Sequence, residues 1–246
     1  MKANKGALIA ETPKYLWLLI LSYSMILAMS NWYDSRIVEI FGISVTPGSM
    51  VYSLTYLISN SITEVYGFKN ARKAILIALV FNIIFLLYGW LVISLPTPTT
   101  ISTNPLFGEF LLVNSRIIGA SFVSYLISEP LNARIFSEMK IKLNEFFGLR
   151  FILPLLISGF VDSILFISIA FYNTIPNKDF FNLILHVWMI KSFVEILGLP
   201  LSIYITKKLK RIEELDIVDT NTNFTMFSLE TNYTKLDNKY KSDNKI

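Results

Sequence analysis

Cysteine is absent from this 246-residue chain, and histidine occurs once, as His186. The chain therefore forms no disulfide and has no thiolate for catalysis or metal binding. A multi-histidine metal cage is excluded as well. The sequence also contains no Walker motif and no dinucleotide fingerprint. We accordingly predict no metal site, no cofactor and no catalytic residue.

Charged residues are also scarce, at 16% of the chain, against about 25% in ordinary soluble domains. Apolar residues make up 53%, and the mean hydropathy is +0.53. A helix needs about 20 largely apolar residues to cross a hydrocarbon core of roughly 30 Å. Uncharged runs of that kind extend over residues 15–33, 40–63 and 74–108. A soluble domain would have to bury all of these runs in one core, so the sequence favours a membrane protein.

The apolar runs predict an all-α integral membrane protein, a bundle of six transmembrane helices. Only helices and closed barrels satisfy the backbone inside lipid, and the runs are too long and too uniform for a barrel. The expected helices cover residues 15–33, 47–66, 72–95, 107–129, 149–172 and 180–206. The chain then divides into an N-terminal segment (1–14), a transmembrane domain (15–206) and a C-terminal tail (207–246).

Lysine and arginine gather in alternate loops. The loop between the second and third helices contains Lys69, Arg72 and Lys73, and basic residues also precede the first helix and follow the fourth and sixth. Because cytoplasmic loops carry the excess of basic residues, both termini, and with them the tail, should be cytoplasmic. This arrangement explains the net charge of +4 without a nucleic-acid partner. The polar composition of the tail predicts disorder toward its end, over residues 237–246.

Polar residues recur within several of the predicted helices. Tyr56, Asn60 and Glu64 are spaced four residues apart, which places them on one helical face. An Asp, Lys or Arg at membrane depth costs at least about 2.5 kcal/mol on insertion scales, so such groups usually face a cavity or a partner. We therefore predict that polar side chains from several helices line one substrate cavity. The candidate residues are Tyr56, Asn60, Glu64, Arg116, Tyr125, Glu129, Ser158, Asp162, Lys191 and Glu195.

A structural interpretation of the same residues stays open. Lys191 and Glu195 are four residues apart and could pair within their helix, while hydroxyl side chains could join neighbouring helices. Glu64 is close to the basic loop and could lie at the membrane boundary. Arg116 falls on a different helical face from its polar neighbours and could pair elsewhere. Pro200 invites a local break in the last helix.

The sequence Glu64-Val65-Tyr66-Gly67 leads into a basic loop that ends at Lys73. This segment resembles the hallmark of the queuosine precursor transporter family, also labelled the vitamin uptake transporter family. The resemblance extends over nearly the whole chain, in order and with compatible spacing. Other residues that carry it are Arg116, Ser128, Arg150, Ser158, Asp162, Lys191, Glu195, Pro200, Tyr204 and Asn223.

Members of that family are six-helix carriers that import 7-deazaguanine precursors of the tRNA base queuosine. The resemblance therefore implies an importer of such a base in a bacterial cytoplasmic membrane. The chain departs from the family pattern at polar positions. Asn60 and Asn132 stand where acidic residues are expected, and Glu129 and Gly159 stand where glutamines are expected. Queuine or another heterocycle consequently stays an alternative substrate.

The implied partner is a small, purine-like molecule within the lipid bilayer. Carboxylates accept the adjacent N–H donors of a guanine-like edge, as Glu64 or Asp162 could, and tyrosine rings offer surfaces for stacking. A homo-oligomer, or a substrate-binding subunit of an ATPase-driven system, stays open. From other classes, an intramembrane enzyme and a structural assembly protein also stay open, although no Ser-His pair or nucleophile elbow supports the enzyme.

Overall fold

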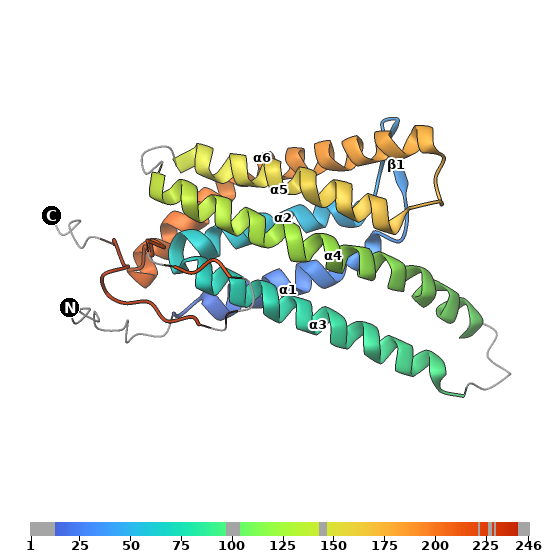
Figure 1. Cartoon of the computed structure of the whole chain (residues 1–246), viewed down its shortest axis with the longest axis horizontal. Coiled ribbons are helices and arrows are strands. Elements are labelled where there is room, and N and C mark those ends of the chain that lie inside the picture. Colours follow the sequence, from blue (N-terminus) through green and yellow to red (C-terminus); the bar gives the residue numbers. More distant parts are fainter. Residues whose placement is uncertain are drawn as a thin grey trace.

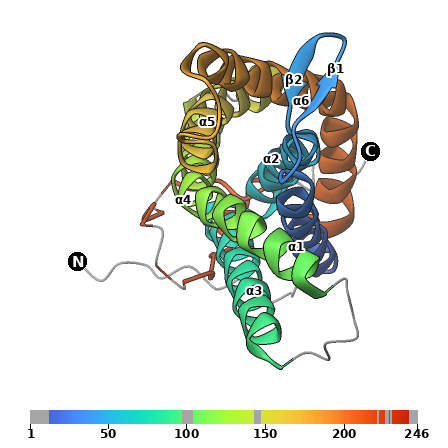
Figure 2. The same ribbon diagram turned by 90° about the vertical axis from the view of Figure 1, so that its right-hand side faces the viewer.

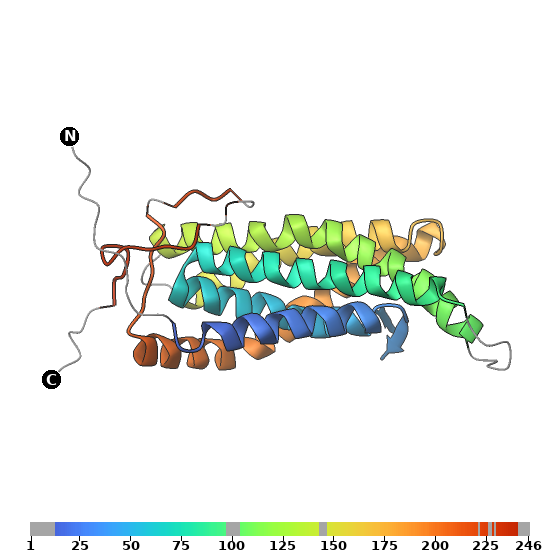
Figure 3. The same cartoon turned by 90° about the horizontal axis from the view of Figure 1, so that it is seen from below.

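The computed structural model describes residues 13–96, 104–142, 147–220, 222–225, 228 and 230–240. Within these ranges the chain forms six helices, which lie side by side along the long axis, and one short hairpin (Figures 1 and 3). The helices are α1 (Leu16–Tyr33), α2 (Pro47–Tyr66), α3 (Phe68–Ser94), α4 (Asn104–Lys142), α5 (Phe147–Ala170) and α6 (Asn177–Glu213). The strands of the hairpin are β1 (Val38–Ile40) and β2 (Ile43–Val45).

In the described part of the chain, five helices are long and apolar enough to cross a membrane, namely α1, α3, α4, α5 and α6. The remaining helix, α2, is the polar centre of the bundle. It contacts each of the other five helices, and most of its residues are buried. Figure 2 looks along the bundle and shows α2 between α1 and α6. Because its neighbours shield it, α2 can remain polar inside the bundle.

Both α4 and α6 are longer than the sequence predicted. The expected end of α4 at residue 129 is wrong, since the helix continues through Pro130 to Lys142. The expected break at Pro200 is also wrong, because α6 is helical from Asn177 to Glu213. The 39 residues of α4 span roughly 58 Å at about 1.5 Å per residue. The helix therefore extends well past a bilayer core, and apolar runs alone do not reveal its polar end.

The hairpin is an addition to the all-α fold that the sequence predicted. Its antiparallel strands pair Val38 with Val45 and Ile40 with Ile43. Phe41 and Gly42 connect them with φ angles of 53° and 78°, and two consecutive positive φ angles favour this type of tight turn. The hairpin lies at the opposite end of the bundle from the α2–α3 turn (Figure 1).

The start of α1 and the end of α6 lie at the same end of the bundle. The backbone N–H groups of Lys14 and Tyr15 donate to the Glu213 carboxylate at 2.9 and 2.7 Å. The Tyr66 hydroxyl, at the end of α2, donates to the same carboxylate at 2.7 Å. An even number of crossings would produce this arrangement.

The chain after α6 packs beneath the α2–α3 turn, and we call its described residues from Glu214 to Tyr240 the strap. Asp237–Tyr240 were expected to be disordered, which is wrong: Val218 N–H donates to Asp237 O at 2.9 Å and Lys239 N–H donates to Asp216 O at 2.8 Å. These backbone hydrogen bonds fix residues 237–240 in place although their side chains are polar. The remaining predicted residues, 241–246, lie outside the described ranges.

Buried polar contacts bind the strap to the turn. The Arg72 guanidinium donates to the carbonyl oxygens of Asn223, Thr225 and Glu230 at 3.2, 2.7 and 2.7 Å. Asp219 accepts hydrogen bonds from the backbone N–H of Phe68 and the hydroxyl groups of Ser137 and Tyr233. Arg72 therefore has a structural task beyond its positive charge.

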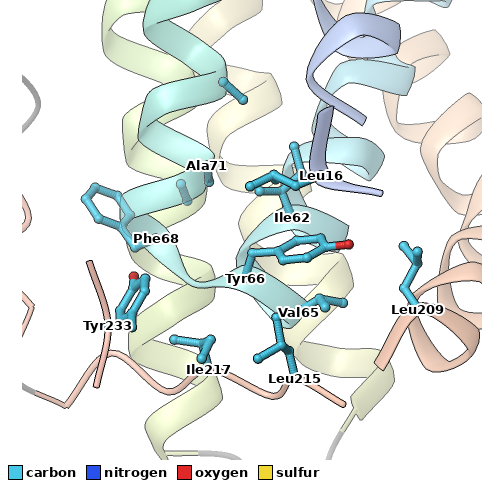
Figure 4. Close-up of a cluster of buried hydrophobic side chains, with 12 residues drawn as sticks. Leu16, Ile62, Val65, Tyr66, Phe68, Ala71, Leu209, Leu215, Ile217 and Tyr233 are labelled. Carbon is cyan, nitrogen blue, oxygen red and sulfur yellow. The ribbon is translucent and has the colours of Figure 1, made fainter. Parts of the chain in front are cut away.

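An apolar cluster completes this contact (Figure 4). Ile217 and Tyr233 of the strap pack with Val65 and Phe68, and Ile217 N–H also donates to Val65 O at 3.2 Å. Gly67 lies between them with φ 81° and ψ 167°, a region that is essentially restricted to glycine. A Cβ atom at Gly67 would also overlap the Tyr233 hydroxyl and the Ile217 side chain.

Gly67→Ala should therefore loosen the strap and lower the stability of the folded protein. Backbone strain of this kind costs about 1–3 kcal/mol, which thermal unfolding in detergent can measure, together with faster proteolysis of the strap. Gly119→Ala is the matched control, because nothing lies within 4 Å of a Cβ atom at this helical glycine. Equal melting temperatures for the two variants would contradict the assigned role of Gly67.

Candidate functional site

Two groups of buried or partly buried polar side chains lie along the bundle. The first, which we call the central cluster, lies between α2, α4, α5 and α6. Its members are Tyr52, Thr55, Tyr56, Asn60, Ser128, Glu129, Asn132, Ser158, Asp162, Lys191 and Glu195. The second, the inner cluster, lies where the helices meet the strap. Its members are Glu64, Lys140, Arg150, Lys210 and Asp216.

An ion pair between α5 and α6 anchors the central cluster. Lys191 Nζ lies 2.5 Å from Asp162 Oδ2, and both side chains are almost completely buried. The Ser128 hydroxyl of α4 donates to the other carboxylate oxygen of Asp162 at 3.1 Å. Lys191 also lies 4.8 Å from the centre of the Tyr52 ring, a cation–π contact that links α6 to α2. The alternative pairing of Lys191 with Glu195 within α6 is not the one that forms.

Amide and hydroxyl groups extend the cluster toward the strap. Asn132 Nδ2 donates to Asn60 Oδ1 at 2.8 Å, and Ser158 Oγ lies 3.4 Å from Asn132 Oδ1. The Tyr56 hydroxyl reaches the carbonyl oxygen of Ser158 at 3.5 Å. Several of these contacts are long for hydrogen bonds. These groups can therefore exchange protein partners for a ligand at small cost.

Some polar atoms in the central cluster have no hydrogen-bond partner within the described residues. They are the Tyr52 hydroxyl, Glu129 Oε2 and both carboxylate oxygens of Glu195. Glu129 Oε1, by contrast, accepts a hydrogen bond from Thr55 at 2.9 Å. Tyr56 lies close enough to Glu129, Asp162 and Glu195 for their charges to act on it. Buried polar atoms without partners are uncommon in folded proteins. The central cluster combines four of them with a buried ion pair, and we take it as the candidate binding site.

Glu64 belongs to the inner cluster and not to the central one. Its Oε1 atom lies 2.5 Å from both Arg150 Nη2 and Lys210 Nζ, while Lys140 Nζ is 3.9 Å from Oε2. Lys140 and Lys210 in turn each lie 2.8 Å from Asp216 of the strap. Glu64 therefore joins four helices and the strap, and its carboxylate is held by cations of the protein itself.

Asp216 is the strap residue in this network. Partial burial raises the pKa of its carboxyl group, but the charges of Lys140 and Lys210 outweigh burial and hold the pKa below its usual range. Asp216 therefore stays ionised and attracted to both lysines throughout the neutral pH range.

The remaining predicted residues occupy different places. Arg116 is exposed, and its guanidinium donates to the carbonyl oxygens of Ile169 and Tyr172 at the end of α5. The Tyr125 hydroxyl donates to Ile75 O at 2.9 Å, with the Tyr23 ring 6.4 Å away. Arg116 thus lies apart from the central cluster, whereas Tyr125 lies beside it.

The prediction missed Thr55, Lys140 and Lys210. Both lysines follow apolar runs and were read as markers of membrane topology, because sequence does not show that their long side chains turn inward. Thr55 is off the four-residue spacing of Tyr56, Asn60 and Glu64. The available signal was the recurrence of hydroxyl residues throughout the α2 segment.

Helices of membrane-spanning length around a buried polar cluster are typical of membrane transporters. Residues 46–205 match the family described as "Putative vitamin uptake transporter", and the chain belongs to that family. The resemblance noted in the sequence is thereby confirmed. The family consists of transporters of vitamin-like molecules and not of enzymes, as the sequence predicted.

A curated relative gives a more specific comparison. "Probable queuosine precursor transporter" from Bacillus subtilis (strain 168) is 24% identical over 184 residues, which cover 73% of this chain and 79% of the relative. No solved structure matches the chain.

Asp34, at the hairpin end of the bundle, provides a test of this geometry through pH. It follows α1 and is buried, and burial raises the pKa of its carboxyl group to about 6, with the charge of Lys191 opposing the rise. Because this pKa exceeds that of the unfolded chain, about 3.9, ionisation costs the folded state stability as the pH rises from about 4 to about 6.

Asp34→Asn should remove this cost. The variant should be more stable than the wild type above pH 6 by roughly 3 kcal/mol, the equivalent of a shift of about two pKa units, and should match it below pH 4. Thermal unfolding in detergent across this pH range measures the difference. Glu39→Gln, on the exposed part of β1, should keep the wild-type profile. If the stability of Asp34→Asn and of the wild type changed with pH in parallel, the raised pKa assigned to Asp34 would be refuted.

Proposed function

We propose that this protein imports a queuosine precursor, a 7-deazaguanine-type base, across a bacterial cytoplasmic membrane. The observation that carries the proposal is the central cluster, in which the Asp162–Lys191 pair is surrounded by polar atoms without protein partners. Family membership and the relative from Bacillus subtilis support the choice of substrate. The substrate would bind among the central-cluster side chains of α2, α4, α5 and α6.

The proposal includes six membrane crossings with both termini in the cytoplasm. In this arrangement α2 crosses within the shield of the other helices, and the strap lies on the cytoplasmic side. The positions of Lys69, Arg72, Lys140 and Lys210, all of which contact the strap or its Asp216, support this orientation. Basic residues are retained on the cytoplasmic side of membrane proteins.

Recognition of the base would use acceptors and aromatic faces of the central cluster. A guanine-like edge presents adjacent N–H donors, which a carboxylate accepts in a bidentate manner. Asp162 is suited to this role because its carboxylate is held in place between Lys191 of α6 and Ser128 of α4. Tyr52 and Tyr56, whose ring centres are 5.4 Å apart in an edge-to-face arrangement, offer surfaces for a flat ring. Glu64, engaged in the inner cluster, is assigned a different task.

Release to the cytoplasm would require the inner cluster to open. Glu64, Arg150, Lys210 and the strap close this end of the bundle. Alternating exposure of a central site requires one barrier on each side that opens in turn. We assign the inner cluster to the cytoplasmic barrier, since its ion pairs join α2, α5, α6 and the strap at one level.

Uptake of a labelled queuosine precursor tests the assignment of the binding site. In cells that do not synthesise queuosine, Asp162→Asn and Lys191→Met should each reduce uptake roughly tenfold or more, because each leaves a buried charge without its partner. Modified tRNA provides the readout. Asp179→Asn, at the exposed start of α6, is the matched control. Wild-type uptake by a stably folded Asp162→Asn variant would overturn the assignment.

Glu64→Gln tests the barrier separately from the binding site. Loss of the carboxylate charge weakens the attraction to Arg150 and Lys210, so transport should change while substrate binding does not. Uptake into proteoliposomes should change by roughly tenfold or more, since a hydrogen bond to a charged group is worth about 1.5–3 kcal/mol. Stabilisation of the purified protein by the precursor should remain within about twofold in affinity. A parallel loss of binding would instead place Glu64 in the substrate site.

A further inference from the structure

A groove on the surface of the bundle lies between the outer face of α3 and the strap. Its volume is about 430 Å³, within the range of about 300–1,000 Å³ that is usual for small-molecule pockets. Apolar side chains and one lysine of α3 form one wall, and two hydroxyl residues of the strap form the other. The lining residues include Lys73, Ile77, Val80, Phe81, Ser228 and Thr231. None of these six belongs to the central or the inner cluster, so the groove is a separate site.

The apolar wall of the groove faces lipid. Val80 and Phe81 are 52% and 60% exposed, and they lie on a helix that is long and apolar enough to cross a membrane. Apolar side chains exposed on such a helix contact acyl chains. An acyl chain therefore fits this wall, whereas a fully polar ligand would leave the wall without a partner.

Lys73 gives the groove a positive charge. The other basic residues of this segment are engaged, since Lys69 Nζ lies 2.6 Å from Glu230 Oε1 and Arg72 binds carbonyl oxygens of the strap. Among the residues that the structure describes, the side chains of Lys73 and Thr231 have no ion-pair or hydrogen-bond partner. The ammonium and hydroxyl groups are hydrogen-bond donors, and phosphate oxygens are strong acceptors for them. This end of the groove is therefore suited to a phosphate group.

The order of these groups along α3 matches that of a phospholipid. Lys73 and Ile77 are four residues apart, which places them on the same helical face. A phosphate group beside the lysine would continue into an acyl chain along Ile77 and Val80. Anionic headgroups attract basic residues at a membrane surface. We propose that the groove binds one anionic phospholipid, with its phosphate group between Lys73 and the strap hydroxyl groups and an acyl chain along the apolar wall.

Such a lipid would join two parts of the fold, because one wall of the groove is on α3 and the other is on the strap. The strap also supplies Asp216 to the inner cluster, where its carboxylate lies 2.8 Å from Lys140 and Lys210. A bound anionic lipid should thus hold the strap in its packed position. This role does not depend on which molecule the protein transports.

Purified full-length protein in detergent provides the test. Its thermal unfolding is followed during titration with dioleoyl phosphatidylglycerol, which is anionic, or with dioleoyl phosphatidylcholine, which has the same chains and no net charge. The wild type should reach half of its maximal stabilisation at a roughly fivefold lower concentration of phosphatidylglycerol, the contribution expected of one lysine near anionic headgroups. Glycerol phosphate, which lacks acyl chains, should not stabilise the protein at these concentrations.

Lys73→Gln should remove this preference, because it takes away the charge at an exposed position where glutamine is tolerated. Lys208→Gln, at an exposed lysine of α6, is the matched control and should retain the preference. Val80→Trp keeps every charge but fills the groove, so it should weaken the binding of phosphatidylglycerol. Its control is Ile84→Trp, one turn further along α3 at a residue that is 54% exposed, which should bind the lipid as the wild type does.

Proteolysis of the strap shows whether the lipid acts at this groove. Trypsin cleaves after lysine, and Lys235 is exposed in the strap. At a lipid concentration ten times that of half-maximal stabilisation, phosphatidylglycerol should slow this cleavage roughly tenfold in the wild type, because the strap must leave the groove before it is cut. The protection should be absent in Lys73→Gln.

Equal midpoints for the two lipids in the wild type would overturn the proposal. So would an equal loss of preference in Lys73→Gln and Lys208→Gln, since this result indicates diffuse attraction to the basic surface. Stabilisation by glycerol phosphate to the same extent would indicate a site for a free anion and not for a lipid. Unchanged lipid binding by Val80→Trp would contradict the position of the acyl chain and likewise overturn the proposal.

Discussion

The burial of a polar helix is the constraint on which this structure depends. As a surface helix, α2 would expose hydroxyl, amide and carboxyl groups to lipid, where each is costly. The bundle avoids this by placing all five other helices around it. Local bonds satisfy part of its polarity: Ser53, Ser61 and Thr63 donate to backbone carbonyls four residues earlier. The rest must be met by α4, α5 and α6, and this demand creates both polar clusters.

The two clusters differ in their balance of charge. At the strap end, Glu64 has more cationic neighbours than its charge requires, and the strap supplies Asp216 as a second acceptor. In the centre, acceptors outnumber donors, and several contacts are long. A network of paired charges favours one geometry, whereas carboxyl groups without a cation leave a place for a ligand. The same helices thus provide a firm closure and an adaptable site one above the other.

Much of the bundle could be predicted from the sequence because lipid imposes simple rules. Apolar length located the helices, and the spacing of Tyr56, Asn60 and Glu64 identified the polar face of α2. The same spacing does not show where along the bundle each side chain finds its partners. Glu64 was therefore predicted to share a site with Asp162, whereas it forms ion pairs with Arg150 and Lys210. The length of an apolar run also does not predict where a helix ends once it continues into a polar sequence. The ends of α4 and α6 were missed for this reason. The packing of the strap was not predicted, because Arg72 holds it through hydrogen bonds to backbone carbonyl oxygens. Amino-acid composition does not predict such bonds.

The hallmark Glu64-Val65-Tyr66-Gly67 gains a physical meaning from the strap. Glu64 forms ion pairs, Val65 accepts a backbone bond, Tyr66 binds Glu213, and Gly67 admits Tyr233. Each of these four partners is encoded later in the chain. During synthesis α2 therefore leaves the ribosome as a polar helix whose partners on α4, α5, α6 and the strap do not yet exist, although α1 precedes it. Its final placement has to wait for α4, α5 and α6, so insertion of this protein into the bilayer is a collective event completed only when the strap has emerged.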